Sequence, residues 1–334
     1  MANVQPPRLY NIGPAASIPG QQCMVANRLG ASIDIGEAII SEAPLVHMRV
    51  GVLIRNFDFN TWMKRPTTRP KIQRKFDGLT PAQQIAFLGL HPTGPGATVQ
   101  QKFFANAFSE ESRYTLGENP TPLQRNVTSL LVFEEISMIN HSCLPNAVFA
   151  WDSERGLATV HATQQIPHGQ EILIEYDCDM TFLPAATRTP LILQELNFQC
   201  VCPLCTAAIN TADSDNRRTQ LQVLDTAIDT AWRHYRAGTW QTNVTDLEQK
   251  QFVPMVNEYY NLLEAERIMD IRLVDALVKA ATISQNVFRH KEKAIELLLK
   301  AIYWCVTAYG DTGYFLDRHD LQLGRILRDV DMTT

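Results

Sequence analysis

One segment decides the fold of this chain: Asn140-His141-Ser142-Cys143-Leu144-Pro145-Asn146. Its cysteine belongs with a cluster of cysteines that lies about 60 residues further along the sequence. Residues 200–205 read Cys-Val-Cys-Pro-Leu-Cys, which places three thiols within six residues. A structural zinc site needs four ligands, with thiolates at about 2.3 Å from the ion. The cysteine of the first segment is the natural fourth ligand. We therefore expect one structural zinc ion, held by Cys143, Cys200, Cys202 and Cys205.

The cysteine content of the chain as a whole fits one metal site better than a disulfide framework. The chain has seven cysteines, an odd number, and Cys23, Cys178 and Cys305 stand apart from the cluster. This usage is typical of a reducing compartment. Incidental buried thiols are the alternative reading of residues 200–205, but that reading does not explain their spacing.

A strand and an aromatic residue complete the pattern. Residues 169–176 read Gly-Gln-Glu-Ile-Leu-Ile-Glu-Tyr, and Phe198 comes just before the clustered cysteines. The N-H-S-C-x-P-N segment, the strand ending in Tyr176 and the F-x-C-x-C-x-x-C motif follow one another in an order that resembles the SET-domain family of protein lysine methyltransferases. In style it is similar to the fungal and MYND-associated branch. The chain has no second cysteine cluster from which a MYND finger could be built.

The resemblance implies an α+β fold. We expect a SET fold of short twisted β-sheets with a pseudoknot, a helical insert, a post-SET zinc subdomain and an α-helical C-terminal domain. The expected boundaries are an N-terminal tail at 1–16, a SET domain at 17–183 with its insert at about 51–127, a post-SET zinc subdomain at 184–210 and the helical domain at 213–334.

The same resemblance implies transfer of a methyl group from S-adenosylmethionine to a lysine side chain of a protein, and a histone is one candidate substrate. Asn140 and the backbone of His141 would hold the cofactor, and Phe198 would pack on its adenine. Tyr176 would be the catalytic residue, lining the transfer channel beside the cofactor. Structural roles remain as alternatives: Asn140 fastening a turn, His141 as a core histidine and Phe198 as core of the zinc subdomain.

The N-terminal cofactor loop departs from the family pattern. Where the family has G-x-G-(L/M)-x-A, the aligned residues place Gln21 and Cys23 at the two glycine positions. Glycine lets the backbone approach a ligand because it has no Cβ. Either the loop takes a different course or cofactor binding is weakened or lost. Gln22 and Met24 are the expected cofactor contacts of this loop.

The expected chemistry sets requirements on the site. A free lysine side chain has a pKa of about 10.4, whereas methyl transfer needs the neutral amine. An apolar channel favours loss of the proton. The hydroxyl of Tyr176 then acts by positioning the amine and does not need to ionise. The zinc ion, with four thiolate ligands, would be structural because it has no open position for a water molecule.

Periodicity predicts the remaining elements. Short strands are expected at 24–26, 38–40 and 46–50, and a hairpin at 147–151 and 157–162. Helices are expected at 80–90, from about residue 213 to a C-cap at Gly238, and at 245–266, 271–286, 291–308 and 316–329. The first of these helices has Thr80 as its N-cap and a proline at its first position. The basic run at 64–74 is expected to be a solvated surface, with binding to nucleic acid or an acidic partner as the alternative.

Composition narrows the class of protein. The 334 residues are 45% hydrophobic, which is enough for a substantial core, and the net charge of −5 gives no general reason to bind nucleic acid. A basic substrate tail, such as that of a histone, would be attracted to an acidic face. Residues 1–8 lack the features of a signal peptide and no apolar run has membrane-spanning length, so the expected compartment is the cytoplasm or the nucleus.

Two other classes of function stay open. The first is a repurposed SET fold that binds a small molecule and catalyses another reaction, such as a cyclisation in secondary metabolism. The observation behind this alternative is that positions 21 and 23 lack the glycines of the family. The second is a non-catalytic interaction module that uses the helical C-terminal domain as a platform.

Overall fold

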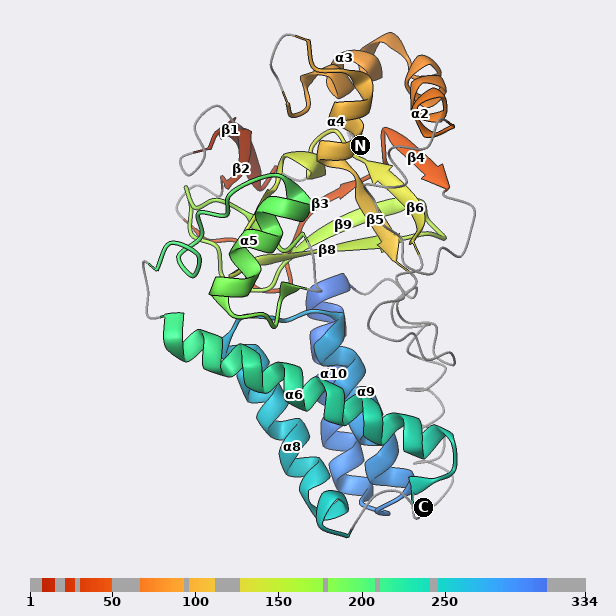
Figure 1. Cartoon of the computed structure of the whole chain (residues 1–334), viewed down its shortest axis with the longest axis vertical. Coiled ribbons are helices and arrows are strands. Elements are labelled where there is room, and N and C mark those ends of the chain that lie inside the picture. The colour runs from red at the N-terminus through yellow and green to blue at the C-terminus, as the bar shows by residue number, and fades with distance from the viewer. Residues whose placement is uncertain are drawn as a thin grey trace, which may run out of the picture.

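The computed structural model describes residues 8–15, 22–27, 31–49, 67–92, 96–111, 127–176, 180–207, 211–240 and 246–310. Small sheets and short helices make up one half of the molecule, and long helices make up the other half (Figure 1). This is the α+β class that the sequence predicts. No described helix is both long enough and apolar enough to cross a membrane.

Two of the sheets are antiparallel and contain the first three strands of the described chain. Strands β1 (Tyr10–Pro14) and β2 (Gln22–Ala26) form an antiparallel hairpin. A three-stranded antiparallel sheet has the order β3 (Ala38–Glu42), β9 (Leu157–Ala162) and β8 (Ala147–Asp152). Strand β1 lies within the stretch expected to be an N-terminal tail, and the hairpin of β8 and β9 is the one that the sequence predicts.

Of the other two sheets, one leads into the segment at 140–146 and the other contains its first two residues. One is antiparallel, with the order β4 (Val46–Arg49), β6 (Val127–Val132) and β5 (Phe108–Glu111). The other is a parallel pair of two-residue strands, β7 (Asn140–His141) and β10 (Leu173–Ile174). A short 3-10 helix, η1 (Ile136–Met138), leads from β6 to β7.

Three helices cover the sheet of β4, β6 and β5. They are α2 (Thr68–Asp77), α3 (Pro81–Gly89) and α4 (Val99–Asn106). Helix α3 begins as predicted, with a capping box in which Thr80 and Gln83 exchange side-chain-to-backbone hydrogen bonds. Helix α2 was not expected as a helix, because its basic sequence contains few apolar positions to mark a buried face.

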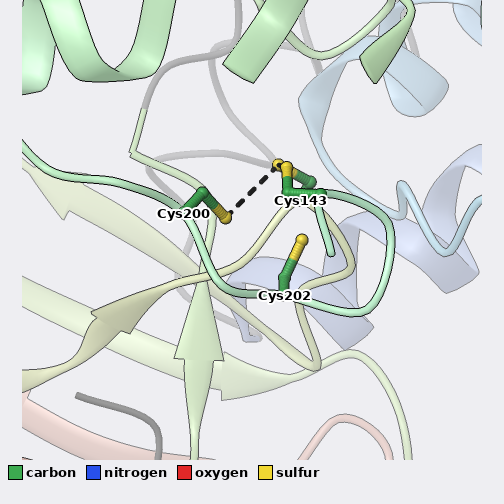
Figure 2. A group of neighbouring side chains, drawn as sticks. Cys143, Cys200 and Cys202 are labelled. Carbon is green, nitrogen blue, oxygen red and sulfur yellow. Dashed lines mark hydrogen bonds between the residues drawn. The ribbon is translucent and has the colours of Figure 1, made fainter. Parts of the chain in front are cut away.

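Helix α5 (Ala185–Leu196) directly precedes the cysteine-rich segment. It ends at Asn197, which has a left-handed φ of 59°, and the chain then turns back towards the loop that precedes β8. Figure 2 shows that Cys200 and Cys202 approach Cys143 from this returning segment. The two parts of the sequence with the decisive motifs therefore meet.

Long helices form the C-terminal half. They are α6 (Thr211–Arg236), α8 (Asp246–Ala265), α9 (Ile271–Asn286) and α10 (Lys291–Tyr309), and they match the predicted helices in this region to within a few residues. The helix predicted at 316–329 lies outside the described residues.

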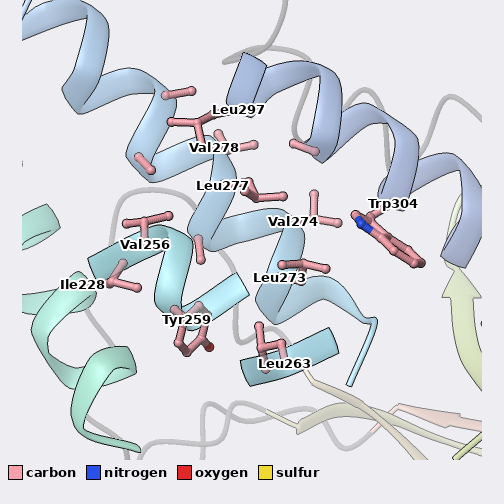
Figure 3. Close-up of a cluster of buried hydrophobic side chains, with 14 of the residues drawn as sticks. Ile228, Val256, Tyr259, Leu263, Leu273, Val274, Leu277, Val278, Leu297 and Trp304 are labelled. Atoms are coloured by element: carbon pink, nitrogen blue, oxygen red, sulfur yellow. The ribbon is translucent and has the colours of Figure 1, made fainter. Parts of the chain in front are cut away.

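The largest hydrophobic core lies between these helices and also touches a sheet. Ala150 of β8 belongs to the same buried cluster, and α10 contacts both β8 and β9. Burial of this apolar surface attaches the helices to the sheet that continues from the segment at 140–146. Figure 3 shows part of the cluster, including Ile228, Val256, Tyr259, Leu263, Leu273, Val274, Leu277, Val278, Leu297 and Trp304.

Candidate functional site

Residues 140–146 and 171–176 are interlocked by backbone and amide hydrogen bonds. Beyond the β7–β10 pair, Ser142 N donates to Ile174 O at 2.9 Å. The side chain of Asn146 continues the ladder, since its Nδ2 donates to Glu171 O at 2.9 Å and its Oδ1 accepts from Leu173 N at 2.8 Å. A side chain thus takes the place of a strand neighbour. For this reason β10 is shorter than the predicted strand ending in Tyr176.

The four predicted zinc ligands converge. The sulfur atoms of Cys143, Cys200, Cys202 and Cys205 all lie within 4.8 Å of one another. The Sγ atom of Cys143 is 3.9 Å from that of Cys200 and 3.6 Å from that of Cys205. A tetrahedral ion with bonds of about 2.3 Å to sulfur requires sulfur atoms roughly 3.8 Å apart. The donor set and its spacing therefore fit zinc, and all four positions would be filled by thiolates.

A buried arginine stands beside this cluster. Arg188, on α5, is only 1% exposed, and its Nε donates to the Sγ of Cys143 at 3.2 Å. Four thiolates around a divalent cation carry a net charge of −2, and a neighbouring guanidinium offsets part of that charge where water cannot. The position of Arg188 on the helix that precedes the cysteines thus suits an anionic metal centre.

A second buried arginine joins the same loop to the C-terminal helices. Arg218, on α6, is fully buried and donates through Nη2 to the backbone oxygen of Cys143 at 2.7 Å. It also donates to Thr181 O, and its Nε contacts Oε2 of the buried Glu266 at 2.7 Å. Arg217 completes the network by donating to the other oxygen of that carboxylate at 2.7 Å.

His141 links the sulfur cluster to Tyr176. The backbone N–H of Tyr176 donates to Nδ1 of His141 at 3.1 Å, so this nitrogen must be the acceptor. The proton of the neutral ring is then on Nε2, which lies 3.4 Å from the Sγ of Cys143 and can donate to it. The histidine thereby fixes the strand end that carries Tyr176 relative to the cysteine cluster.

Three aromatic rings enclose the position of Tyr176. Its ring centroid lies 5.3 Å from that of His141, 6.0 Å from that of Phe198 and 6.5 Å from that of Phe108. The Tyr176 hydroxyl donates to Ile139 O at 2.6 Å, although the residue as a whole is 40% exposed. Burial of the hydroxyl, with a smaller effect from the charge of Glu171, raises the pKa of Tyr176. The phenol is therefore neutral throughout the physiological range.

The remaining predicted cofactor residues occupy different positions. Asn140 is buried, and its Nδ2 donates to Oε1 of Glu171 at 2.7 Å. Met24 is fully buried in the core, where its backbone oxygen accepts from Ile172 N at 2.8 Å. Gln22 is exposed at the start of β2. The side chain of Asn140 therefore takes part in the hydrogen bonds between the interlocked segments, whereas Met24 takes part only through its backbone.

One of the two residues that replace the family's glycines, Cys23, lies in the described part of the chain. Cys23 lies on β2, is 1% exposed and has its Sγ 3.7 Å from Pro14 O, so its side chain is accommodated inside the hairpin. Gln21 lies outside the described residues.

Several contributing residues were not found from the sequence. Glu171 was seen only as part of a strand, although a carboxylate next to a run of apolar residues is a signal for a specific hydrogen-bond partner. Phe108, Arg188 and Arg218 come from segments without a recognisable motif. Only the fold places them near Tyr176 and Cys143.

Comparison with known proteins agrees with this geometry. The SET-domain family model matches residues 32–177. Protein-lysine N-methyltransferase SMYD4 of Homo sapiens is 38% identical over 74 residues, which are 22% of this chain and 9% of that protein. Histone-lysine N-methyltransferase set5 of Schizosaccharomyces pombe is 34% identical over 92 residues, or 27% of this chain and 28% of that protein. The matches thus span less than a third of these relatives.

A solved structure of the SET domain of LSMT bound to lysine and AdoHcy is 11% identical, with a TM-score of 0.31, over 98% of this chain and 89% of that one. The family match covers the interlocked segments, and it ends just after Tyr176. The SET fold expected from the motifs is confirmed by the family match, which spans residues 32–177.

Proposed function

We propose that this chain transfers a methyl group from S-adenosylmethionine to a lysine side chain of a protein. The observation that carries the proposal is the placement of Tyr176. Its hydroxyl is held by Ile139 O at 2.6 Å and its backbone by His141 at 3.1 Å, next to the ring of Phe198. The relatives named above, which are described as protein-lysine methyltransferases, support the same class of reaction.

Asn140, the backbone of His141 and the ring of Phe198 would hold the cofactor in this proposal. Phe198 offers a ring close to His141, at 5.6 Å between centroids, and adenine stacks well on such a surface. Asn140 is fixed by Glu171, which orients its amide. Met24 would contribute only through its backbone, and Gln22 is the exposed residue at the edge of this loop. When bound, S-adenosylmethionine would supply the activated methyl group.

The role of Tyr176 follows from its protonation state. The hydroxyl proton is committed to Ile139 O, so the oxygen can accept a hydrogen bond from the substrate amine. Because burial raises the pKa of Tyr176, the phenol stays neutral at the pH at which a desolvated lysine loses its proton. Tyr176 would then align the nitrogen lone pair with the methyl group, a contribution of orientation.

Zinc would act on this site through structure alone. With four thiolate ligands it has no open position, and its nearest connection to Tyr176 runs through His141. A histone tail is one suitable substrate in this proposal, because the net charge of −5 favours a basic partner.

The test is Tyr176→Phe, which removes only the hydroxyl. We expect the rate of transfer to fall about 10²–10³-fold, as when one well-placed hydrogen-bonding group leaves an active site. Binding of S-adenosylmethionine should change little. The measurement is incorporation of labelled methyl groups into methyl-lysine, using heat-treated cell extract as the protein pool.

Tyr303→Phe is the matched control, because Tyr303 is 56% exposed on α10. It should leave the rate unchanged. Equal rates for the wild type and Tyr176→Phe would contradict the assigned role. Absence of methyl-lysine with every protein pool, in a chain that binds the cofactor, would favour a small-molecule substrate instead.

A further inference from the structure

A basic groove lies between the edge strand β4 and helix α2. It is open to solvent and has a volume of about 610 Å³. The described residues that line it, called the basic groove below, are His47, Met48, Arg49, Lys71, Arg74 and Lys75.

The cations of the basic groove come from one face of helix α2 and from the end of strand β4. Lys71, Arg74 and Lys75 are exposed and are spaced by three and four residues, so they share one face of α2. Ile72 is 1% exposed and packs in the same core as Met48, which holds the helix against the strand. Arg49 is exposed at the end of β4 and adds a cation from the other side of the groove.

These four cations have no carboxylate partner among the described residues. The described lining residues include no aspartate or glutamate, and no ion pair joins any of the four to a described acidic group. Asp77, at the end of α2, accepts a hydrogen bond from Gln73 at 2.9 Å instead. Clustered like charges repel one another, and the chain as a whole carries −5, so the groove is a local reversal of charge suited to an anionic occupant.

The form of the groove favours an extended peptide over nucleic acid. Within the described part of the chain β4 pairs only with β6, so its other edge presents backbone N–H and C=O groups that an extended chain can use. Single-stranded nucleic acid is usually bound with aromatic rings on which bases stack. Among the described lining residues the one ring is that of His47, which already contacts Trp151 at 5.6 Å between centroids.

We propose that the basic groove binds an extended acidic segment of a partner protein, with its carboxylates paired to α2 and Arg49. The site is separate from Tyr176. In the sheet order β4-β6-β5, the groove is at one edge, whereas Phe108 on the opposite edge strand reaches Tyr176. Docking at the groove therefore does not depend on methyl transfer.

The experiment measures fluorescence anisotropy of a labelled peptide of alternating glutamate and serine, titrated with the whole chain. The variant is Lys71→Gln, Arg74→Gln and Lys75→Gln together, which keeps helix propensity nearly constant. We expect it to weaken binding about tenfold, since each exposed ion pair contributes modestly. Salt should weaken binding to the wild type, and a peptide of alternating glutamine and serine should not bind.

The matched control carries Arg155→Gln, Arg233→Gln and Arg236→Gln, which are exposed positions elsewhere and change the net charge equally. It should bind as the wild type does. If the variant on α2 fails to fold, Arg49→Gln tests the groove from the strand and should weaken binding two- to threefold, or about 0.5 kcal/mol.

Equal loss in the control and the α2 variant would overturn the proposal, because it would show attraction by total charge alone. So would the absence of peptide binding at low salt. Tighter binding of duplex DNA than of the peptide, lost in the α2 variant, would assign the groove to nucleic acid and would also overturn it.

Discussion

Cys143→Ala should reduce the zinc content of the purified chain from one ion towards none. The four sulfur atoms lie within 4.8 Å of one another, and removal of one leaves three ligands from a single short segment. In small zinc domains the binding energy of about 10–16 kcal/mol contributes to folding directly. We expect residues 198–205 to lose their attachment to the segment at 140–146. The measurements are metal analysis and thermal unfolding.

Cys305→Ala is the control for this prediction. Cys305 is also completely buried, but it lies in the helical core and away from the sulfur cluster. It should retain one zinc ion and lose only the modest stability expected for a small cavity. Retention of a full equivalent of zinc by Cys143→Ala would contradict the assignment of this fourth ligand.

Arg218→Met should lower the free energy of unfolding by about 3–5 kcal/mol, the cost of breaking a buried ion pair from one side. The change leaves Glu266, which is 1% exposed, without the contact at 2.7 Å, and it removes the donor to Cys143 O. Methionine keeps most of the apolar stem, so packing changes little. Urea denaturation measures the effect.

Arg217→Met is the matched comparison. Its side chain is 34% exposed, and it contacts the same carboxylate at 2.7 Å. Because Arg217 is partly exposed to water, its ion pair with Glu266 contributes about 1 kcal/mol or less to the free energy of unfolding. Equal losses for the two variants would mean that the buried network around Arg218 does not hold the α6 helix to the loop at Cys143.

The sequence predicted the elements whose signals are local. The spacing of Cys200, Cys202 and Cys205 indicated a zinc site that needs a fourth ligand from elsewhere in the chain. The apolar periodicity of α9 and α10 predicted helices that pack on one another. Thr80 as an N-cap, followed by proline at the first helical position, likewise predicted α3. These features depend on neighbours within a few residues or on ligand chemistry.

The parts that were not predicted depend on distant contacts. Helix α2 buries little besides Ile72, so its basic sequence resembles a surface loop. Strand β10 is short because Asn146, 27 residues before Leu173, supplies a side-chain acceptor to its backbone. Arg188 and Arg218 contact Cys143 across 45 and 75 residues, and no local pattern marks such partners.

The assignment of a cofactor site beside Tyr176 is tested most directly by calorimetric titration of the zinc-loaded chain with S-adenosylhomocysteine. We predict a dissociation constant of about micromolar order, equivalent to about −8 kcal/mol. Phe198→Ala should weaken it up to about tenfold, through loss of ring stacking. Leu193→Ala, at a 54% exposed position on α5, should not. Absence of binding by a folded, zinc-containing chain would contradict the account.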